Sequence, residues 1–538
     1  LLDGHNIVVR ADANPATMRE VALIAGGGSG HEPAHGGYVG QGMLHAAVAG
    51  DVFASPTPDA VLAAIRAVTG APGCLLIVKN YTGDRLNFGL AAAVARSEGL
   101  SVDMVVVADD VAIPDDGGTA GRRGIAGAVL IHKIAGAAAA AGADLAAVKA
   151  AVEAALPDLG TMGVALSPCV LPGAAAPNFT LGADEIELGL GIHGEPGVRR
   201  AALAPADALV DTLIETIAVD RNLARGDRVA LLVNDLGSTT PMELAVVARR
   251  ALSALEARGL TVERVWSGRF LTALDMAGVS LSLLRVDDDR LARLDASTGA
   301  LAWPTQPAQR PAGRTIAAPA PTGTATASSG GTKVPCPALP AAIDAIADAL
   351  IANEARLTEM DRAVGDGDIG ASLVRGAEAL RAAVKAAPTD DAAAALRVLE
   401  AAWRRAVGGT SGPLYAMFLL HAADRLAAAK EGEPRGKTYA DAFLAGCAGI
   451  SALGGAQRGD RTMLDALLPA AEAFAREIAS GAALAAAWRS AITAAEQGAT
   501  AVRTMRARRG RSSYLGDRVI GAPDPGAEAV VAWLSAIK

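Results

Sequence analysis

Three aspartates stand close together in the segment "DRAVGDGDIG", at Asp361, Asp366 and Asp368. Carboxylates this near to one another repel one another unless a cation lies between them. Oxygen ligands favour a hard ion, and Mg²⁺ keeps coordination positions open for water or phosphate oxygens. A calcium loop is excluded because its last ligand must be a glutamate, where this chain has Ser372 or Ala377. The segment predicts a magnesium site, and a solvated turn that caps the next helix is the structural alternative.

Two glycine-rich segments that follow could bind the phosphates of a nucleotide. The segment "GGTSGPLY" (408–415) offers backbone N–H groups and the hydroxyls of Thr410 and Ser411, and "GRSSYLGDR" (510–518) contains Arg511 close to further arginines. Successive backbone N–H groups form a nest for anions, and phosphoryl transfer depends on charge neutralisation. Together with the aspartates, these segments suit a site for a metal ion and a triphosphate.

Histidines in glycine loops form a second group of reactive residue types. The segment "GGGSGHEPAHGG" (26–37) contains His31 and His35, and "GLGIHGEPG" (189–197) contains His193. Glycine at the end of a strand marks a tight turn or a close approach of the backbone to a ligand, and histidine can serve as a nucleophile, a proton carrier or a metal ligand. A dinucleotide site at the second loop is disfavoured, because "EPG" follows where a helix would have to begin. These loops predict a ligand site, with a structural role for His193 as the alternative.

Short apolar runs that end in polar residues or glycine must position the histidine loops. Such runs are typical of parallel strands covered on both faces, and functional residues gather at their carboxyl ends. The runs are "VALIA" (21–25), "CLLIVKN" (74–80), "VDMVVVADD" (102–110) and "RVALLVNDLG" (228–237). Residues 157–195 indicate more strand and loop. We therefore expect residues 1–303 to form two packed α/β subdomains, of about 1–156 and 157–303.

The segment 304–337 separates this part from a region of different composition. It is rich in Pro, Ala, Thr, Ser and Gly without periodicity, which is the composition of a linker. Beyond it, residues 338–538 consist of long alanine- and leucine-rich stretches broken by glycine clusters, with no evident strand. This pattern predicts an all-α domain whose glycine loops lie at one end.

Composition excludes several classes of protein. The 538 residues include 49 basic and 57 acidic side chains, and the net charge of −8 argues against a nucleic-acid-binding surface. The four cysteines match no metal-ligand spacing and fit a reducing compartment. No cationic, apolar signal segment opens the chain, and no uninterrupted apolar run of about 18 residues occurs. We expect a cytoplasmic enzyme without a membrane segment; the start at "LLDGHNIVVR", without methionine, indicates that N-terminal residues are missing.

Six motifs of the chain resemble the single-chain, ATP-dependent dihydroxyacetone kinase family, in the family order. "GGGSGHEPAHGGYVGQGML", "VKNYTGDRLNFG" and "GLGIHGEPG" resemble the substrate-binding K domain, and "GDGDIGAS", "GGTSGPLY" and "GRSSYLGDRVIGAPDPGA" resemble the nucleotide-binding L domain. The resemblance implies a K domain of two α/β parts and an L domain that is a barrel of eight helices, with ATP and two Mg²⁺ ions at one end. It also implies a cytoplasmic homodimer in which each nucleotide domain caps a K-domain site.

The same resemblance implies roles for the residues around the ketose. His193 would bind the keto carbon covalently as a hemiaminal, because a short ketose has little surface to bury. His31 would hydrogen-bond the adduct and help to move protons, and Asp84 would accept the proton of the hydroxyl that attacks the γ-phosphate. The residues that would hold the sugar's oxygens are Gly28, Ser29 and Lys79.

Roles in the nucleotide domain are implied in the same way. The ligands of Mg²⁺ would be Asp361, Asp366 and Asp368. The contacts to ATP would come from Ser372, Gly409, Thr410, Ser411, Thr462, Met463, Arg511 and Asp524. Outside the motifs, we expect His35 and Glu32 to support the ketose site, with a direct role left open. The histidines expected to be structural are His5, His45, His132 and His421.

The activity implied is ATP-dependent phosphorylation of dihydroxyacetone to dihydroxyacetone phosphate. Three other functions stay open on the sequence. The substrate could be another short sugar, D-glyceraldehyde or erythrulose. The nucleotide site could also cyclise FAD to a cyclic FMN product. A non-catalytic ketose-binding regulator is the third alternative, against which the complete set of aspartates argues.

Overall fold

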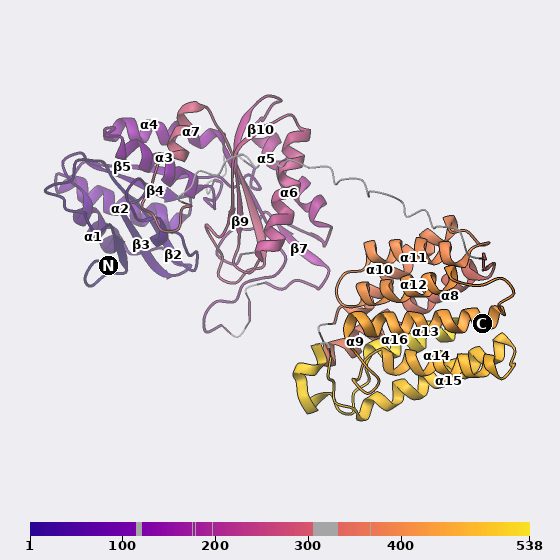
Figure 1. Cartoon of the computed structure of the whole chain (residues 1–538). Coiled ribbons are helices and arrows are strands. Elements are labelled where there is room, and N and C mark those ends of the chain that lie inside the picture. The colour runs from indigo at the N-terminus through magenta and orange to yellow at the C-terminus, as the bar shows by residue number, and fades with distance from the viewer. Residues whose placement is uncertain are drawn as a thin grey trace. The chain divides into compact units, whose positions relative to one another are not determined.

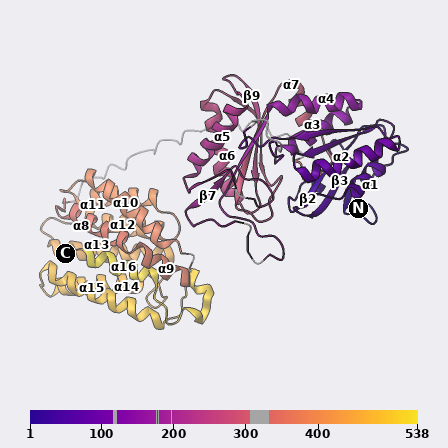
Figure 2. The ribbon, with the colours of Figure 1, turned by 180° about the vertical axis from the view of Figure 1, so that it is seen from behind.

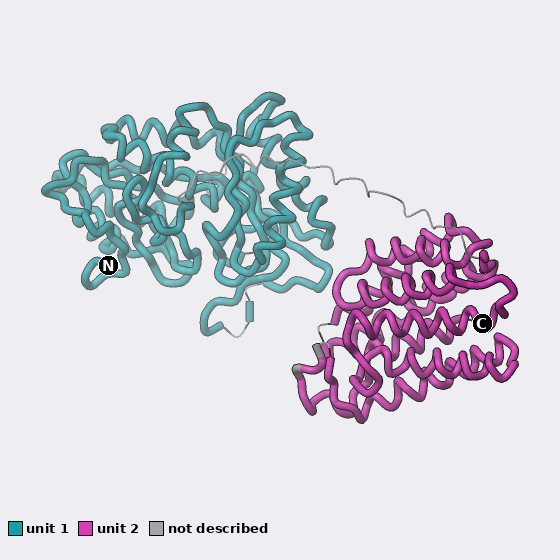
Figure 3. Tube along the Cα trace, in the orientation of Figure 1, with its two compact units in different colours: residues 1–316 teal, residues 317–538 magenta. Residues whose placement is uncertain are grey.

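The computed structural model describes residues 1–114, 121–174, 176–177, 179–195, 197–304, 332–365, 367–509 and 511–537. Asp366 lies outside the described residues, as does most of the expected linker, residues 305–331; at Arg511 and Tyr514 only the backbone is described. The chain divides into two compact units, Leu1–Ile316 and Ala317–Lys538 (Figure 3).

The first sheet of unit 1 is built from the apolar runs of the N-terminal segment. Its strand order is β1-β3-β2-β4-β5, and all neighbours are parallel except β1 and β3. The strands are β1 (Ile7–Val9), β2 (Ala22–Ser29), β3 (Ala46–Val52), β4 (Cys74–Lys79) and β5 (Val102–Val107). The helices that accompany it are α1 (Pro58–Val68), α2 (Thr82–Ser97), α3 (Ala128–Ala140) and α4 (Leu145–Ala155), with the 3-10 turns η1 (Gly36–Tyr38) and η2 (Leu156–Asp158).

Both faces of this sheet are covered, as the apolar runs predict. Leu76 of β4 packs in a cluster with α1 and α2, whereas Leu75 and Ile77 pack in a cluster with α3 and α4. Alternate side chains of a strand point to opposite faces. A strand between two helical layers therefore needs apolar residues at every position, which is why "CLLIV" has no polar member.

The second sheet has the strand order β10-β9-β11-β6-β7-β8, and Figure 1 labels its strands β7, β9 and β10. The strands are β6 (Leu159–Ala165), β7 (Glu185–Leu188), β8 (Arg199–Ala202), β9 (Arg228–Asp235), β10 (Thr261–Gly268) and β11 (Gly278–Arg285), and the helices are α5 (Ala206–Asp220), α6 (Pro241–Ala257) and α7 (Asp288–Asp295). Only β9 and β10 are parallel; the other neighbours are antiparallel. The expectation of a parallel strand at 228–237 thus holds on one side of β9 and fails on the other, where β11 runs antiparallel.

Helix α3 lies between the two sheets. Its residues Val129 to Ile131 are fully buried, and the cluster that contains them joins Leu23 of β2 to Leu232 of β9. Helices α5 and α6 cover the opposite face of the second sheet, where Leu213 and Leu255 pack on Leu231. The two α/β subdomains therefore share the hydrophobic cluster around α3, and each has a further cluster on its outer face.

The elements of secondary structure described in unit 2 are all helices (Figures 1 and 2). Its helices are α8 (Leu339–Ala352), α9 (Glu354–Val364), α10 (Ile369–Ala383), α11 (Ala392–Ala406), α12 (Ser411–Ala427), α13 (Arg435–Gly454), α14 (Leu464–Ala479), α15 (Leu484–Ala501) and α16 (Pro525–Ala536), with the 3-10 turns η3 (Val384–Ala386), η4 (Val502–Thr504) and η5 (Arg511–Val519). The expected fold class, an α/β half followed by a helical domain, is confirmed. Of the helices described in either unit, none is long and apolar enough to cross a membrane.

Candidate functional site

The glycine-rich segment 26–37, which begins inside β2 and is called the glycine loop below, lies directly on two buried, charged side chains. A Cβ atom at Gly27 would stand 3.1 Å from Lys79 Nζ and 3.5 Å from Asp84 Oδ2, and one at Gly28 would stand 2.7 Å from the backbone of Phe53. Lys79 ends β4 and Asp84 lies in the first turn of α2. The absence of side chains on this loop therefore lets its backbone approach a cation and a carboxylate from a neighbouring strand and helix.

The polar side chains of the glycine loop support its backbone. The Ser29 hydroxyl donates a hydrogen bond of 2.7 Å to the carbonyl oxygen of Gly50, and the Glu32 carboxylate accepts one of 3.1 Å from the N–H of Gly30. Because the hydroxyl hydrogen of Ser29 is committed to Gly50, a ligand can reach this side chain only at a lone pair of its oxygen.

Four rings from four separate segments meet above the loop. The ring centroid of His193 lies 4.4 Å from Tyr81, 5.0 Å from His31 and 5.4 Å from Phe53, each in an edge-on arrangement, and His31 stacks on Phe53 at 5.2 Å. His31 follows β2 of the first sheet, whereas His193 lies between β7 and β8 of the second. The structure thus brings together the two histidines that the sequence places in different motifs.

Both histidines are neutral near pH 7. Burial lowers the pKa of His31 well below 6.5, and Lys79 and His193 lower it further. Burial, followed by Lys79 and Arg123, lowers the pKa of His193 to about 3. His31 Nδ1 lies 2.8 Å from the Thr272 carbonyl oxygen, which can only accept, so Nδ1 carries the proton and Nε2 a lone pair. A neutral imidazole keeps a lone pair for attack on carbon or for taking up a proton.

Lys79 is a buried cation whose Nζ has no hydrogen-bond partner among the described residues. Burial lowers its pKa, while Asp84 and Asp109 act in the opposite direction. Burial raises the pKa of Asp84, and Lys79 offsets part of that rise. Buried polar groups in native proteins have partners, so an unsatisfied ammonium beside a carboxylate and two neutral imidazoles indicates a place for the oxygens of a polar ligand.

A second pair of histidines lies behind the loop. His35 Nδ1 and His132 Nε2 are 3.0 Å apart, and both side chains are buried. Burial is the main cause that lowers the pKa of His132 to about 3 and that of His35 well below its usual value. His132, expected to be structural by itself, is therefore one half of a hydrogen-bonded pair that only the fold brings together. His45 has a structural contact, since its Nδ1 accepts from the N–H of Leu23 at 3.1 Å.

These buried histidines predict that unit 1 loses stability in acid. A histidine whose pKa falls from 6.5 to about 3 on folding contributes free energy of unfolding that is fully present above pH 6.5 and is lost as the pH falls towards 3. Each such group contributes a slope of at most about 1.4 kcal/mol per pH unit. Denaturant unfolding between pH 7 and pH 4 measures this slope. His132→Gln should make it shallower, and His5→Gln, a change at an exposed histidine, should not; equal slopes in wild type and His132→Gln would contradict the assignment.

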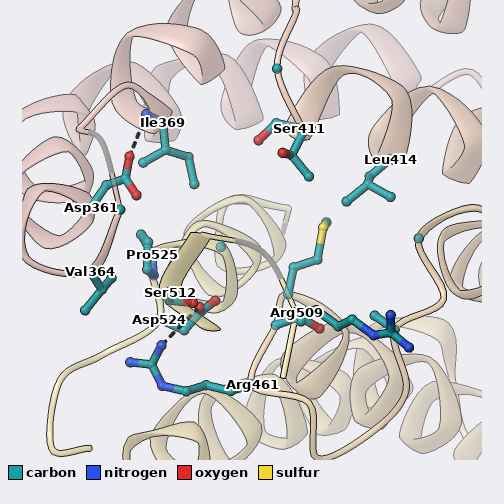
Figure 4. A pocket seen from close by; sticks show the side chains of 18 of the residues that line it. Asp361, Val364, Ile369, Ser411, Leu414, Arg461, Arg509, Ser512, Asp524 and Pro525 are labelled. Carbon is teal, nitrogen blue, oxygen red and sulfur yellow. Dashed lines mark hydrogen bonds and ion pairs between the residues drawn. The ribbon is translucent and has the colours of Figure 1, made fainter. Parts of the chain in front are cut away.

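Unit 2 contains a cavity of about 260 Å³ at the ends of several helices (Figure 4). Its walls come from the loops before α10, α12, α14 and α16. The lining residues that the sequence singles out are Asp361, Asp368, Gly409, Thr410, Ser411, Thr462, Met463 and Asp524. Ser372 is not among the lining residues; it is buried, and its hydroxyl accepts a hydrogen bond of 3.0 Å from Arg375. The glycine clusters of the helical domain therefore enclose one pocket.

Two carboxylates of this cavity differ in what they do. Asp361 is buried, and its Oδ2 accepts hydrogen bonds from the N–H groups of Asp368 at 3.0 Å and Ile369 at 3.3 Å, so it caps α10 (Figure 4). Asp368 is exposed in the pocket. No cluster of three metal-binding side chains occurs among the described residues, which leave out Asp366. Two carboxylates in one pocket are nevertheless the hard oxygen ligands with which Mg²⁺ is held while it keeps open positions, so the donor set fits this ion.

Arg461 is the residue of this cavity that sequence reasoning missed. Its side chain is fully buried. Its Nη2 donates hydrogen bonds of 3.0–3.3 Å to the carbonyl oxygens of Val519, Ala522 and Pro523. Its Nη1 lies 3.8 Å from Asp524 Oδ2. Asp524 in turn caps α16, and burial raises its pKa to about 6. Arg461 thus ties two walls of the pocket together. In the sequence it is one arginine in a polar loop, and nothing there distinguishes it from an exposed one.

Comparison with known proteins gives similarities that run through both units. The Dak1 domain model matches residues 1–302, and the DAK2 domain model matches residues 363–538. A putative 3,4-dihydroxy-2-butanone kinase of Solanum lycopersicum is 46% identical over 552 residues, covering 99% of this chain and 93% of that protein. The triokinase/FMN cyclase of Mus musculus is 44% identical over 550 residues, covering 100% and 93%. The crystal structure of the dihydroxyacetone kinase of C. freundii with AMP-PNP and Mg²⁺ superposes with a TM-score of 0.58 at 35% identity, covering 98% and 92%.

Proposed function

We propose that this chain, which belongs to the two-domain dihydroxyacetone kinase family, transfers the γ-phosphoryl group of ATP to a hydroxyl of dihydroxyacetone. The observation that supports the proposal is that each unit has one group of polar residues suited to a substrate. Unit 1 has an unsatisfied lysine beside two neutral histidines and a buried aspartate, and unit 2 has a pocket with carboxylates and glycine-rich helix ends. The first set suits a small carbonyl compound and the second a nucleotide with its metal ion.

His193 would hold the ketose by a covalent bond. A ring nitrogen of the neutral imidazole adds its lone pair to the keto carbon, the π electrons of the carbonyl pass to oxygen, and the oxygen gains a proton while the other ring nitrogen loses one. The product is a neutral hemiaminal, so no oxidant or reductant is needed. His31 lies edge-on to His193 with a free Nε2 lone pair, which places a proton acceptor beside this exchange. The low pKa of His193 supports this role, because only the unprotonated ring can attack.

Asp84 would accept the proton of the hydroxyl that attacks phosphorus, and Lys79 would hold the substrate's oxygens. The opposite charges of Lys79 and Asp84 attract each other, and both side chains lie close to Gly27. In unit 2, Asp361 and Asp368 would hold Mg²⁺, with Asp366 as the third ligand and two ions in the complete site. Bound Mg²⁺ supplies the positive charge that neutralises the phosphate oxygens during transfer. Thr410 and Ser411, at the start of α12, would direct N–H groups at the phosphates.

The named relatives favour two extensions of this activity. The tomato protein is named for a four-carbon ketose and the mouse protein for a second, FMN-cyclising activity. We therefore propose that the substrates include three- and four-carbon carbonyl sugars, and that FAD is a second substrate of the unit 2 pocket. The family resemblance also predicts a homodimer, which light scattering of the purified protein checks.

A coupled ADP-release assay over a panel of sugars tests the proposal. We expect turnover with dihydroxyacetone. We also expect turnover with D-glyceraldehyde or erythrulose if the glycine loop leaves space for these sugars. Glycerol, which has the carbon skeleton of dihydroxyacetone without its carbonyl, should be slower by orders of magnitude, because it cannot form the hemiaminal. Cyclic FMN formation from FAD is followed in parallel. Glycerol turnover as fast as that of dihydroxyacetone would refute covalent capture, and absence of ADP release with every sugar would refute the kinase assignment.

A further inference from the structure

The loop that carries His193 is fastened at both of its ends by one arginine. Nη2 of Arg123 donates a hydrogen bond of 2.6 Å to the carbonyl oxygen of Gly189, where the loop leaves β7, and Nη1 lies 3.4 Å from Glu195 Oε1, where the loop turns back. The side chain of Arg123 is 15% exposed. A guanidinium presents several donors in one rigid plane, so a single side chain fixes the distance between the two ends of the loop.

The carboxylate of Glu195 fills the centre of the same loop. Its Oε2 accepts a hydrogen bond of 2.8 Å from the backbone N–H of His193 itself. A Cβ atom at Gly191 would collide with this carboxylate, so the backbone wraps around it with no room for a side chain. Glu195 therefore binds the main chain of His193 directly and forms an ion pair of 3.4 Å with Arg123.

Arg123 is also connected to both sheets, through Asp110. Its Nε donates to Asp110 Oδ2 at 2.8 Å, and the second oxygen of Asp110 accepts from the N–H of Ala112 at 3.1 Å. Asp110 is fully buried and follows β5 of the first sheet, while its backbone forms a bridge to Thr161 in β6 of the second. The chain of contacts thus runs from the two sheets through Asp110 and Arg123 to the loop of His193.

We propose that Arg123 and Glu195 are positioning residues of the ketose site, which hold the backbone of His193 so that its imidazole faces the keto carbon. The proposal rests on the function proposed for His193. Addition to a carbonyl needs the attacking nitrogen within a narrow range of distance and angle, and a displacement of about 1 Å can reduce a rate 10²-fold. A loop of glycines does not fix its own backbone, so the geometry must come from outside the loop. Arg123 also contributes, after burial and Lys79, to the low pKa of His193.

Three variants of the whole protein test this role. In Glu195→Gln the amide oxygen can still accept from the His193 N–H, and only the ion pair with Arg123 is lost, which is worth little at a partly exposed site. Glu195→Ala removes the acceptor and leaves a hole inside the loop. Arg123→Lys keeps the charge but not the fork of donors. The matched control is Arg250→Lys, which loses the Nε and Nη2 contacts to Asp211 on the outer helices α5 and α6.

The readouts separate positioning from stability. Dihydroxyacetone labelled with ¹³C at its keto carbon reports the hemiaminal by NMR, since that carbon changes from trigonal to tetrahedral. We expect Glu195→Ala to lose about 10²-fold in kcat/KM for the ketose, together with the hemiaminal signal, at unchanged KM for ATP. Arg123→Lys should lose less, and Glu195→Gln should stay within a few-fold of wild type. Melting temperatures of the two Glu195 variants should match that of Arg250→Lys, whereas Arg123→Lys should melt lower, because it also loses contacts to the buried Asp110.

Each outcome decides the proposal. Wild-type hemiaminal signal and ketose KM in Glu195→Ala would overturn it, as would equal losses in Glu195→Gln and Glu195→Ala. If Glu195→Ala does not fold, Arg123→Lys is used for the test instead. A folded Arg123→Lys protein with a wild-type hemiaminal signal and ketose KM would then refute the role. A wild-type enzyme that turns over without any hemiaminal signal would refute the covalent part of the proposed function alone, and the ketose KM values would then still decide whether Glu195 positions the loop.

Discussion

Replacing His193 with alanine is expected to abolish covalent capture of the ketose and to reduce kcat/KM for dihydroxyacetone by at least about 10³-fold, because both the anchor and the orientation of the attacking hydroxyl are lost. The fold should persist, since His193 lies in a glycine-rich loop and its ring packs edge-on against Tyr81, Phe53 and His31 at the surface of the core. Affinity for ATP should be unchanged, because the pocket that we propose for the nucleotide is built from residues of unit 2. Intact-protein mass spectrometry after gentle trapping measures the adduct.

Asp84→Asn is the matched variant for this experiment. It replaces a carboxylate with an amide of the same size, so it removes the proposed proton acceptor and keeps the anchor. We expect the adduct to form and turnover to be lost, which is the opposite pattern to His193→Ala. An adduct that survives in His193→Ala would eliminate this histidine as the nucleophile, and full turnover in Asp84→Asn would eliminate the aspartate as the base.

Asp368→Asn is expected to reduce ATP turnover by about 10²-fold or more while the ketose adduct persists. The side chain of Asp368 is exposed in the unit 2 cavity, so the change removes one hard ligand and one charge with little effect on packing. Asp361→Asn is a less clean test, because the Asp361 carboxylate also caps α10. The measurement is ADP release as a function of Mg²⁺ concentration, which should show a weaker apparent affinity for the metal ion.

The control for Asp368→Asn is Asp390→Asn, at an exposed carboxylate of the same unit that pairs with Lys333 and does not line the cavity. It has the same change in charge and should behave like wild type at every Mg²⁺ concentration. Asp366→Asn should behave like Asp368→Asn. Turnover like that of wild type in both Asp366→Asn and Asp368→Asn would show that these aspartates do not hold the ion.

The parts of the fold that the sequence predicts are those set by burial. An apolar run such as "CLLIV" between polar ends requires a layer on each face, and β4 has both. Strand direction does not follow from burial. The buried apolar residues of β9 pair with the parallel strand β10 on one side and with the antiparallel strand β11 on the other. The mixed second sheet could not be predicted for that reason.

In the candidate site, likewise, the sequence predicts the types of the reactive residues but not their contacts. Histidines and aspartates in glycine-rich segments predict chemistry, because few structural roles need those types at those positions. What such residues touch depends on segments far apart in the chain. The buried position of Arg461, the pairing of His35 with His132 and the bond from Ser29 to Gly50 have no local signal. Each depends on how two distant backbones meet.

Helix α3, which packs against both sheets, restricts how the proposed ketose site can open. His31 belongs to the first sheet and His193 to the second, so in many two-part enzymes such a site would open by hinge rotation of one part against the other. Here that rotation would pull Leu23 or Leu232 away from α3 and expose a continuous apolar layer to water. In the proposed reaction, the sugar would therefore enter and its phosphate ester leave by movement of the loop that carries His193, while the two sheets keep their relative positions.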